Sequence, residues 1–222
     1  LEDWARGKGA LTDLVAPALS GHGIDAETWG AVALAQLQLV LDSDLDGQGL
    51  TLANLKPARR LPELGFTFPV GDLQVQRLRH ILSDPAHGLA EPLREAASRL
   101  EFDSLKGFLK GFIDLTFEHD GRWYILDYKS NWLGPDASYY GGERLLQALA
   151  GEHYYLQYLI YLVALRRFLR QRLADFSNEQ LGGAYYLFLR GMPEAGVYFA
   201  RPSDALLDAL DQLFEEARHV AA

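Results

Sequence analysis

A β-hairpin near the middle of the chain constrains the fold more than any other feature. Two strand-like runs, residues 107–117 and 123–130, flank a tight turn at Asp120-Gly121. Asp-Gly is strongly preferred at the centre of a two-residue type I′ turn, because both central positions need a positive φ. This turn places Phe117 opposite Tyr124 and thereby predicts the register of the whole hairpin.

Three charged side chains fall together in that register. Asp114 comes to lie opposite Asp127, with Cβ atoms ~4.5–5.5 Å apart. Lys129 shares a face with Asp127, because side chains alternate along a strand, and so lies diagonally across from Asp114. Two facing carboxylates destabilise a sheet unless something neutralises them.

A divalent cation is one way to neutralise this cluster. Hard oxygen ligands suit Mg²⁺ or Mn²⁺, and Asp114, Asp127 and the backbone carbonyl of Tyr128 are the candidate metal ligands. Lys129 would then orient the attacking water or stabilise charge on a phosphate. The alternative is a salt-bridged surface in which Lys129 alone neutralises both acids. A register slip of one residue would separate the two carboxylates onto opposite faces.

The rest of the pattern predicts an α/β fold with a mixed central sheet flanked by helices and an N-terminal helical region. Further strands are expected at 63–69, 183–190 and 197–201. Helices are expected at 1–6 and 26–41, in pieces over 75–100, as one long helix over 143–173, and from the cap Ser203 to about 219.

Composition excludes several classes of protein. The chain has no cysteine, so disulfides, thiolate nucleophiles and Cys-based metal sites are excluded. Its longest apolar runs fall far short of the ~20 residues of a membrane span, and no secretory leader opens it. We therefore expect a cytoplasmic protein without a membrane partner.

The net charge of −9 argues against a free-standing nucleic-acid binder, which usually has a positively charged surface patch. Two groups of basic residues offer a local one: Lys106 and Lys110 at the start of the hairpin, and four arginines within 166–172. For these arginines, interaction with the helix dipole is an equal alternative.

An acidic loop starting at Asp42 matches the opening of a calcium-binding loop, with Asp44, Asp46 and Gly47 in sequence. The position of the closing bidentate glutamate is occupied by Ala53. A solvated acidic turn is the favoured interpretation.

Several motifs resemble those of one enzyme family. Gly111–Leu115 followed by Leu126–Asn131 is similar to the signature of the PD-(D/E)XK nucleases in its RecB-type form. Gln157 through Tyr161 matches the Q-x-x-x-Y element of that group, and 182–191 resembles the strand that follows it. The resemblance implies a restriction-endonuclease-like core in which Asp114 and Asp127 hold the metal, Lys129 is the catalytic lysine, and Gln157 and Tyr161 line the site. For Gln157 and Tyr161, helix packing is the alternative.

The same resemblance implies a function. It is that of a Mg²⁺-dependent exodeoxyribonuclease, in which Mn²⁺ can substitute, acting on single-stranded or unwound DNA during double-strand break repair and recombination. Residues 1–222 would form one nuclease domain of a larger helicase–nuclease subunit, with 1–100 as a mostly helical lead-in and 101–222 as the catalytic core. Its partners would be helicase domains and the other subunits of an exodeoxyribonuclease V-type complex.

One departure from the family pattern leaves a second function open. RecB-type members carry a histidine ligand in an H-x-x-x-E pattern, and Glu2 matches its glutamate, which would place the histidine upstream of Leu1. His153, four residues before Gln157, is the histidine in this chain best placed to approach the site, although a surface role is favoured. The alternative function is a catalytically silent nuclease fold with a structural or DNA-binding role.

Overall fold

A five-stranded mixed sheet forms the centre of the computed structural model, which describes residues 1–102 and 105–219. The strands lie side by side in chain order, β1-β2-β3-β4-β5. β3 and β4 pair in parallel, and all other neighbours are antiparallel. The mixed sheet predicted from sequence is confirmed. The strands span Arg60–Leu73 (β1), Leu105–His119 (β2), Arg122–Lys129 (β3), Leu181–Phe188 (β4) and Val197–Ala200 (β5).

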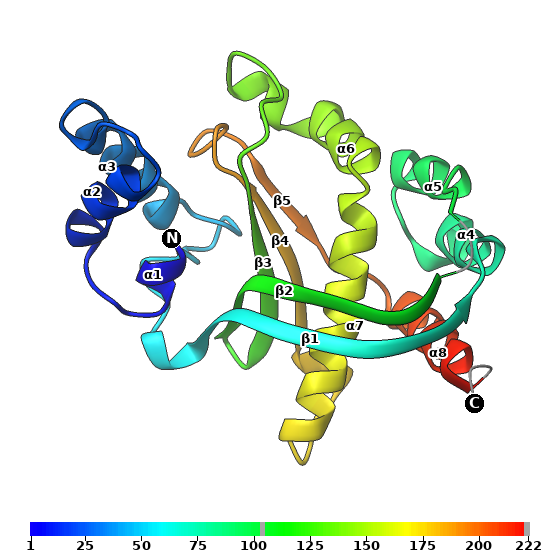
Figure 1. Ribbon diagram of the computed structural model, residues 1–222. Helices are drawn as coiled ribbons and strands as arrows, with labels where there is room; N and C mark the ends of the chain where they lie inside the picture. Colours follow the sequence, from blue (N-terminus) through cyan, green and yellow to red (C-terminus); the bar gives the residue numbers. More distant parts are fainter. Residues whose placement is uncertain (103–104, 220–222) are drawn as a thin grey trace.

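Helices that follow β1 in the chain cover one face of the sheet (Figure 1). Their apolar side chains join those of the sheet in the larger hydrophobic core, in which Leu159, Leu162 and Leu210 are fully buried. None of the described helices is both long enough and apolar enough to cross a membrane. The helices are α4 (Val75–Ser83), α5 (Glu91–Ser98), α6 (Gly142–Gly151), α7 (Tyr154–Arg172) and α8 (Asp204–His219).

The N-terminal region covers the other face with a second core. Residues 40–55 pack there on β2, β3 and β4, with Val40 and Leu52 fully buried. The sequence predicted two of its helices but not α2, which begins without a side-chain cap and has Pro17 inside it. With both faces of the mixed sheet covered, the restriction-endonuclease-like α/β fold is confirmed. The helices are α1 (Glu2–Ala5), α2 (Leu11–Gly21) and α3 (Ala26–Asp42), and Asp25 caps α3 as predicted. Short 3₁₀ helices lie at 57–59, 85–87, 137–140 and 178–180.

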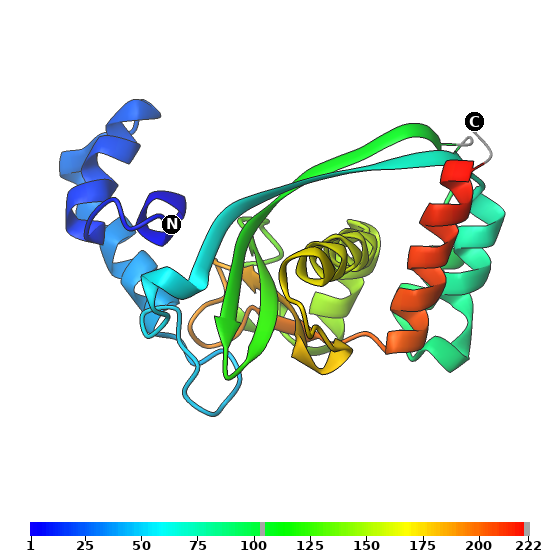
Figure 2. The same ribbon diagram turned by 90° about the horizontal axis from the view of Figure 1, so that it is seen from below.

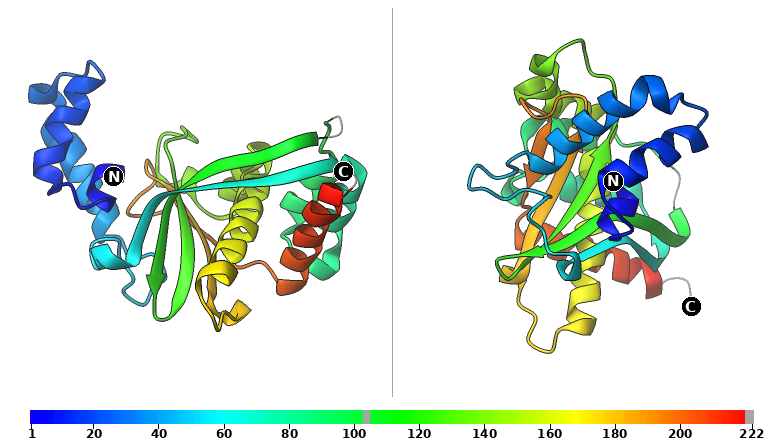
Figure 3. Two further views of the ribbon diagram at one scale, coloured as in Figure 1. Left: turned by 60° about the horizontal axis from the view of Figure 1, so that its bottom comes forward. Right: turned by 90° about the vertical axis from the view of Figure 1, so that its left-hand side faces the viewer.

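β1 and β2 continue beyond the rest of the sheet as a long two-stranded ribbon. The ribbon arches over α7 and reaches α4 and α8 at its far end (Figures 2 and 3). Its inner side packs on the helices: Phe66 meets the ring of Tyr161 edge-on at 5.5 Å, and Phe68 lies 5.5 Å from Phe214. β1 thus contributes an edge strand, the position in which prolines such as Pro62 and Pro69 are tolerated.

The single long helix expected over 143–173 is wrong. It is two helices, α6 and α7, separated at His153, whose φ of +54° is left-handed. A helix cannot continue through a left-handed residue, so the chain changes direction there. This break sets the direction of α7 beneath the ribbon.

The acidic loop after α3 is a turn stabilised by its own backbone. The Asp44 carboxylate accepts hydrogen bonds from the N–H groups of Asp46, Gly47 and Gly49, and Asp46 accepts from Gln48 and Leu50. These aspartates are engaged in local turn hydrogen bonds, as the solvated-turn interpretation predicted.

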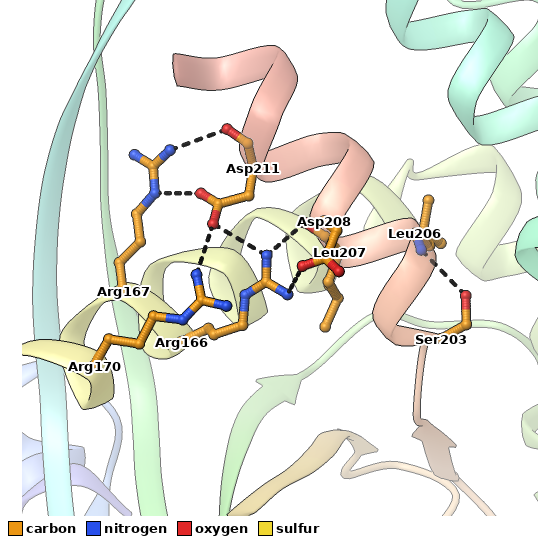
Figure 4. Close-up of polar contacts among 8 residues, drawn as sticks. All are labelled: Arg166, Arg167, Arg170, Ser203, Leu206, Leu207, Asp208 and Asp211. Carbon is orange, nitrogen blue, oxygen red and sulfur yellow. Dashed lines mark hydrogen bonds and ion pairs between the residues drawn. The ribbon is translucent and has the colours of Figure 1, made fainter. Parts of the chain in front are cut away.

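Three of the four arginines near the end of α7 are ion-paired and do not form a free basic patch. Arg166 is fully buried, and its guanidinium contacts Asp208 and Asp211 of α8 at 2.7 and 3.1 Å (Figure 4). Arg167 and Arg170 also pair with Asp211, at 2.6 and 3.2 Å. The acids that pair with Arg166, Arg167 and Arg170 come from a helix distant in the sequence, so the sequence did not predict these contacts. The cluster joins α7 to α8.

Candidate active site

The register predicted for the hairpin is confirmed. His119 pairs with Arg122, Phe117 with Tyr124, and the described ladder ends at Leu115 and Leu126. Asp114 and Asp127 therefore occupy the first position beyond the ladder and not, as expected, a position within it. The reason is that β2 turns away from β3 here to continue in the ribbon with β1. Both residues lie where the two strands separate.

Asp114 forms a side-chain hydrogen bond in the gap between β2 and β3, just beyond the last pair of the ladder. Its Oδ2 accepts a hydrogen bond of 3.0 Å from the backbone N–H of Tyr128. The N–H and C=O of one strand residue point to the same side, so the carbonyl of Tyr128 also faces the gap between β2 and β3. Asp114 and Tyr128 line a cavity of about 350 Å³ together with Leu1, Glu2 and Glu63.

Asp127 is a buried carboxylate with a cation beside it. Its Oδ2 lies 2.7 Å from Nζ of Lys129, and the two side chains are 6% and 10% exposed. Burial raises the pKa of Asp127 to about 6; the Lys129 ammonium lowers it, and the Asp114 charge raises it further. No described ion pair joins Lys129 to Asp114, so the lysine does not neutralise both acids.

The ammonium of Lys129 is held from three sides. Besides Asp127, it donates a 2.9 Å hydrogen bond to Oε1 of Gln157 on α7. It also lies 3.9 Å from the ring centroid of Tyr154 and 5.0 Å from that of Tyr186. Rings at these distances attract a cation through their negative faces. The geometry fixes the position of one lysine nitrogen beside a buried carboxylate.

Gln157 connects this lysine to two tyrosines. Its Oε1 also accepts the Tyr186 hydroxyl at 2.8 Å, and its Nε2 donates to the Tyr161 hydroxyl at 3.0 Å. Every polar atom of the Gln157 side chain is thereby used, which fixes the orientation of its amide. The two predicted residues of α7 thus lie on one helix face, directed at β3.

Sequence reasoning missed the part played by Tyr186. β4 is buried along its whole length and contains two adjacent tyrosines, of which Tyr186 packs in the α7 core and Tyr185 in the N-terminal core. Alternation would have separated them, but only the packing of α7 reveals which tyrosine approaches the lysine. Burial raises the pKa of Tyr186 well above its ordinary value, so it remains a hydrogen-bond donor.

His153 lies on the edge of the site region without touching the carboxylates. Its ring nitrogen is 3.2 Å from the Tyr155 hydroxyl, and it lines a groove of about 290 Å³ with Lys110, Gln157 and Tyr161. Trp132, which follows β3, is 66% exposed and lies beside the Arg190 guanidinium. Neither His153 nor Trp132 places a metal-binding atom beside Asp114 and Asp127.

The donors at the gap fit a hard divalent cation. No group of three or more His, Cys, Asp or Glu side chains gathers in metal-binding geometry within residues 1–102 and 105–219. Asp114, Asp127 and the carbonyl of Tyr128 would be the ligands, and Mg²⁺ is commonly bound by one or two carboxylates while it keeps several waters. Burial raises the pKa of Asp127 despite its ion pair with Lys129, and a bound cation would further stabilise its charged form.

Known proteins resemble this chain over most of its length. The RecBCD enzyme subunit RecB of Escherichia coli (strain K12) is 38% identical over 192 residues, which is 84% of this chain and 16% of that protein. RecB of Haemophilus influenzae is 35% identical over 184 residues, 80% of this chain and 15% of that protein. RecB of Mycobacterium tuberculosis (strain ATCC 25618 / H37Rv) is 38% identical over 194 residues, which is 76% of this chain and 18% of that protein. The chain spans about a sixth of the length of the curated relatives it matches.

A family comparison covers nearly the whole chain. The family described as "PD-(D/E)XK nuclease superfamily" matches residues 21–222, which include both strands of the hairpin, α7 and β4. The match agrees with the resemblance found in the sequence. This chain therefore belongs to the PD-(D/E)XK nuclease superfamily.

Proposed function

We propose that this chain is a divalent-metal-dependent DNA nuclease domain that hydrolyses phosphodiester bonds. The observation that carries the proposal is the position of Lys129, whose ammonium contacts Asp127 at 2.7 Å and Gln157 at 2.9 Å beside the gap that Asp114 borders. A buried lysine paired with a buried carboxylate where two strands separate is a costly arrangement for the fold alone.

In this proposal Asp114, Asp127 and the carbonyl of Tyr128 hold Mg²⁺, and Mn²⁺ can replace it. Such an ion, when bound, offsets negative charge on a phosphate and makes water a stronger nucleophile at neutral pH. Lys129 places a fixed positive charge beside the reacting phosphate. A water oxygen forms the new bond to phosphorus, the bond to the leaving oxygen breaks, and that oxygen takes up a proton. Gln157 keeps Lys129 in place through the reaction.

We further propose exonucleolytic action on single-stranded or unwound DNA during double-strand break repair and recombination. The relatives are named as subunits of the RecBCD enzyme, and this chain corresponds to only about a sixth of each. The domain would therefore work in the bacterial cytoplasm beside helicase domains and other subunits of an exodeoxyribonuclease V-type complex. Residues 1–222 would act as one nuclease domain, with 101–222 as its catalytic core.

A histidine upstream of Leu1 would complete the proposed metal site. Leu1 and Glu2 line the same cavity as Asp114, so residues preceding Leu1 in a longer protein can reach this carboxylate. We expect a chain extended upstream, with histidine three residues before Leu1, to bind the ion more tightly than this chain does.

The second candidate is a silent nuclease fold with a structural or DNA-binding role. It is favoured by the small donor set, because no cluster of three metal-binding side chains occurs in the described residues. The intact group of Asp114, Asp127 and Lys129 favours the enzyme instead.

One assay separates the two candidates. Release of acid-soluble label from linear single-stranded DNA would be measured with Mg²⁺ and with Mn²⁺ for this chain, for an upstream-extended chain, and for Asp127→Ala and Lys129→Ala. The enzyme predicts cleavage that needs the cation and is lost in both variants. Absence of cleavage by the extended chain with either ion, or equal cleavage by Asp127→Ala, would contradict the proposal.

A further inference from the structure

The outer face of the ribbon carries an alternation of basic and aromatic side chains. Lys106, Phe108, Lys110 and Phe112 occupy every second position of β2, and all four are exposed. The two phenylalanines are 66% and 68% exposed, and among the large exposed hydrophobic side chains of the described residues only Trp132, at 66%, is as exposed as Phe108. Neighbours on this face are about 7 Å apart, because each strand residue advances ~3.3 Å. We call these four residues the β2 stripe.

Uncharged residues of β1 lie opposite three members of the β2 stripe. Its neighbours on β1 are Pro69 opposite Phe108, Thr67 opposite Lys110, and Gly65 opposite Phe112, none of which carries a charge. No ion pair between described residues involves either lysine of the stripe. In a chain of net charge −9, this is a local surface of opposite sign.

The β2 stripe leads directly to the proposed active site. Side chains alternate along a strand, so the next residue on the same face after Phe112 is Asp114. The opposite face, with Leu109 and Ile113, packs in the α7 core. Along this face of β2, the side chains are exposed at Lys106, Phe108, Lys110 and Phe112, and the carboxylate of Asp114 is half-buried.

We propose that a single strand of nucleic acid lies along the β2 stripe on its way to Asp114 and Asp127, with its bases on Phe108 and Phe112 and its phosphates near Lys106 and Lys110. This inference rests on the proposed function, since it names where the substrate of that site binds. Aromatic rings beside lysines are how proteins hold single strands without sequence preference, because every base has a face that can stack. Lysines contribute through the phosphates.

The alternation favours a nucleic acid over a protein partner. An apolar protein interface is depleted of lysine at its centre, yet here Lys110 lies between the two phenylalanines. A double helix is a poorer fit, since its bases are stacked on each other and offer no free face to the rings.

The test measures binding without cleavage. Fluorescence anisotropy in EDTA would follow a 20-nucleotide oligo(dT) and an abasic strand of equal length, which keeps the phosphates but has no bases. Phe108→Ala/Phe112→Ala should weaken oligo(dT) binding at least about tenfold and leave abasic binding unchanged. Lys106→Ala/Lys110→Ala should weaken both probes and reduce the slope of log K against log salt by about 0.7 for each phosphate that a lysine no longer neutralises.

Trp29→Ala/Lys56→Ala is the matched control, because Trp29 is 54% exposed and Lys56 is exposed, both away from the ribbon. It should bind both probes as the unchanged chain does. Circular dichroism would verify that each variant is folded, and the lysine pair tests the stripe independently of the phenylalanine pair.

The outcomes separate this inference from the proposed function. Unchanged oligo(dT) binding by both stripe variants, or no binding by the original chain at low salt, overturns the inference even if the chain cleaves DNA, and the phenylalanines would then be a protein contact. If the stripe variants lose binding but neither this chain nor the upstream-extended chain cleaves DNA, the strand path is supported and the proposed nuclease function is contradicted.

Discussion

The side-chain carbonyl of Gln157 accepts a 2.9 Å hydrogen bond from the ammonium of Lys129 and a 2.8 Å hydrogen bond from the hydroxyl of Tyr186. One oxygen of α7 therefore joins β3 to β4 at the candidate active site. A lysine side chain has about 2 kcal/mol of rotamer entropy to lose when it is fixed. Holding it in advance leaves the ammonium in place when a phosphate arrives.

Loss of that carbonyl should slow catalysis more than it weakens DNA binding. We expect Gln157→Leu to reduce kcat roughly 10- to 100-fold with little change in KM, because Lys129 would no longer be held beside Asp127. Gln157→Glu, which keeps an acceptor oxygen, should retain more activity. Steady-state cleavage of linear single-stranded DNA measures both, with the exposed Gln147→Leu of α6 as control. Equal kcat values for the original chain and Gln157→Leu would contradict the role.

The hydroxyl of Tyr186 should have a smaller effect of the same kind. Tyr186→Phe keeps the ring near Lys129 and removes only the hydrogen bond to Gln157, a loss of about 0.5–1.5 kcal/mol, or roughly two- to tenfold in kcat. Tyr185→Phe is the matched control, because that side chain lies on the opposite face of β4. A larger effect from Tyr185→Phe would show that stability, and not the position of Lys129, was changed.

Binding of a divalent cation should release a proton from Asp127. The pKa of this carboxyl is raised from 3.8 to about 6 by burial. The protonated form is thus favoured in the folded protein: its contribution to stability is complete below pH 3.8 and is lost as the pH rises through 6. A cation needs the carboxylate, so Mn²⁺ affinity should fall as the pH drops below 6. Calorimetry in buffers of different ionisation enthalpy should find close to one proton released at pH 5 and almost none at pH 8. Asp127→Asn should release none, and the same proton release by that variant would assign it elsewhere.

The contact between α7 and α8 should depend on Asp211. This one carboxylate contacts Arg166, Arg167 and Arg170, and the guanidinium of Arg166 is fully buried. Asp211→Asn removes the charge that faces all three, and we expect the free energy of unfolding to fall by about 2 kcal/mol. Urea denaturation measures it, with the exposed Asp175→Asn as control. A change below about 0.5 kcal/mol, the range of ordinary surface substitutions, would contradict this account.

The hairpin and its carboxylates could be predicted because their determinants are local. Asp120-Gly121 sets the turn, the turn sets the register, and the register pairs the strands as far as Leu115 and Leu126, the neighbours of Asp114 and Asp127. What the turn cannot encode is where the ladder ends. That depends on β2 leaving β3 for a ribbon with β1, a strand some forty residues earlier in the chain.

The surroundings of Lys129 depended on contacts between distant segments. Gln157 shares a helix face with Tyr161 in the sequence, but only the break at His153 and the packing of α7 under the ribbon direct that face at β3. The arginines of α7 illustrate the same limit, because their partner Asp211 belongs to a helix that the sequence could not place beside them.

The sequence by itself determined the hairpin, its register as far as Leu115 and Leu126, and the shared face of Asp127 and Lys129, since period-two alternation and turn chemistry act over a few residues. The tertiary structure alone decided which tyrosine meets the lysine, which charges the arginines neutralise, and which face of β2 stays exposed. These depend on how the sheet twists and which helix covers it, and helix packing on a sheet is decided by the burial of side chains far apart in the chain.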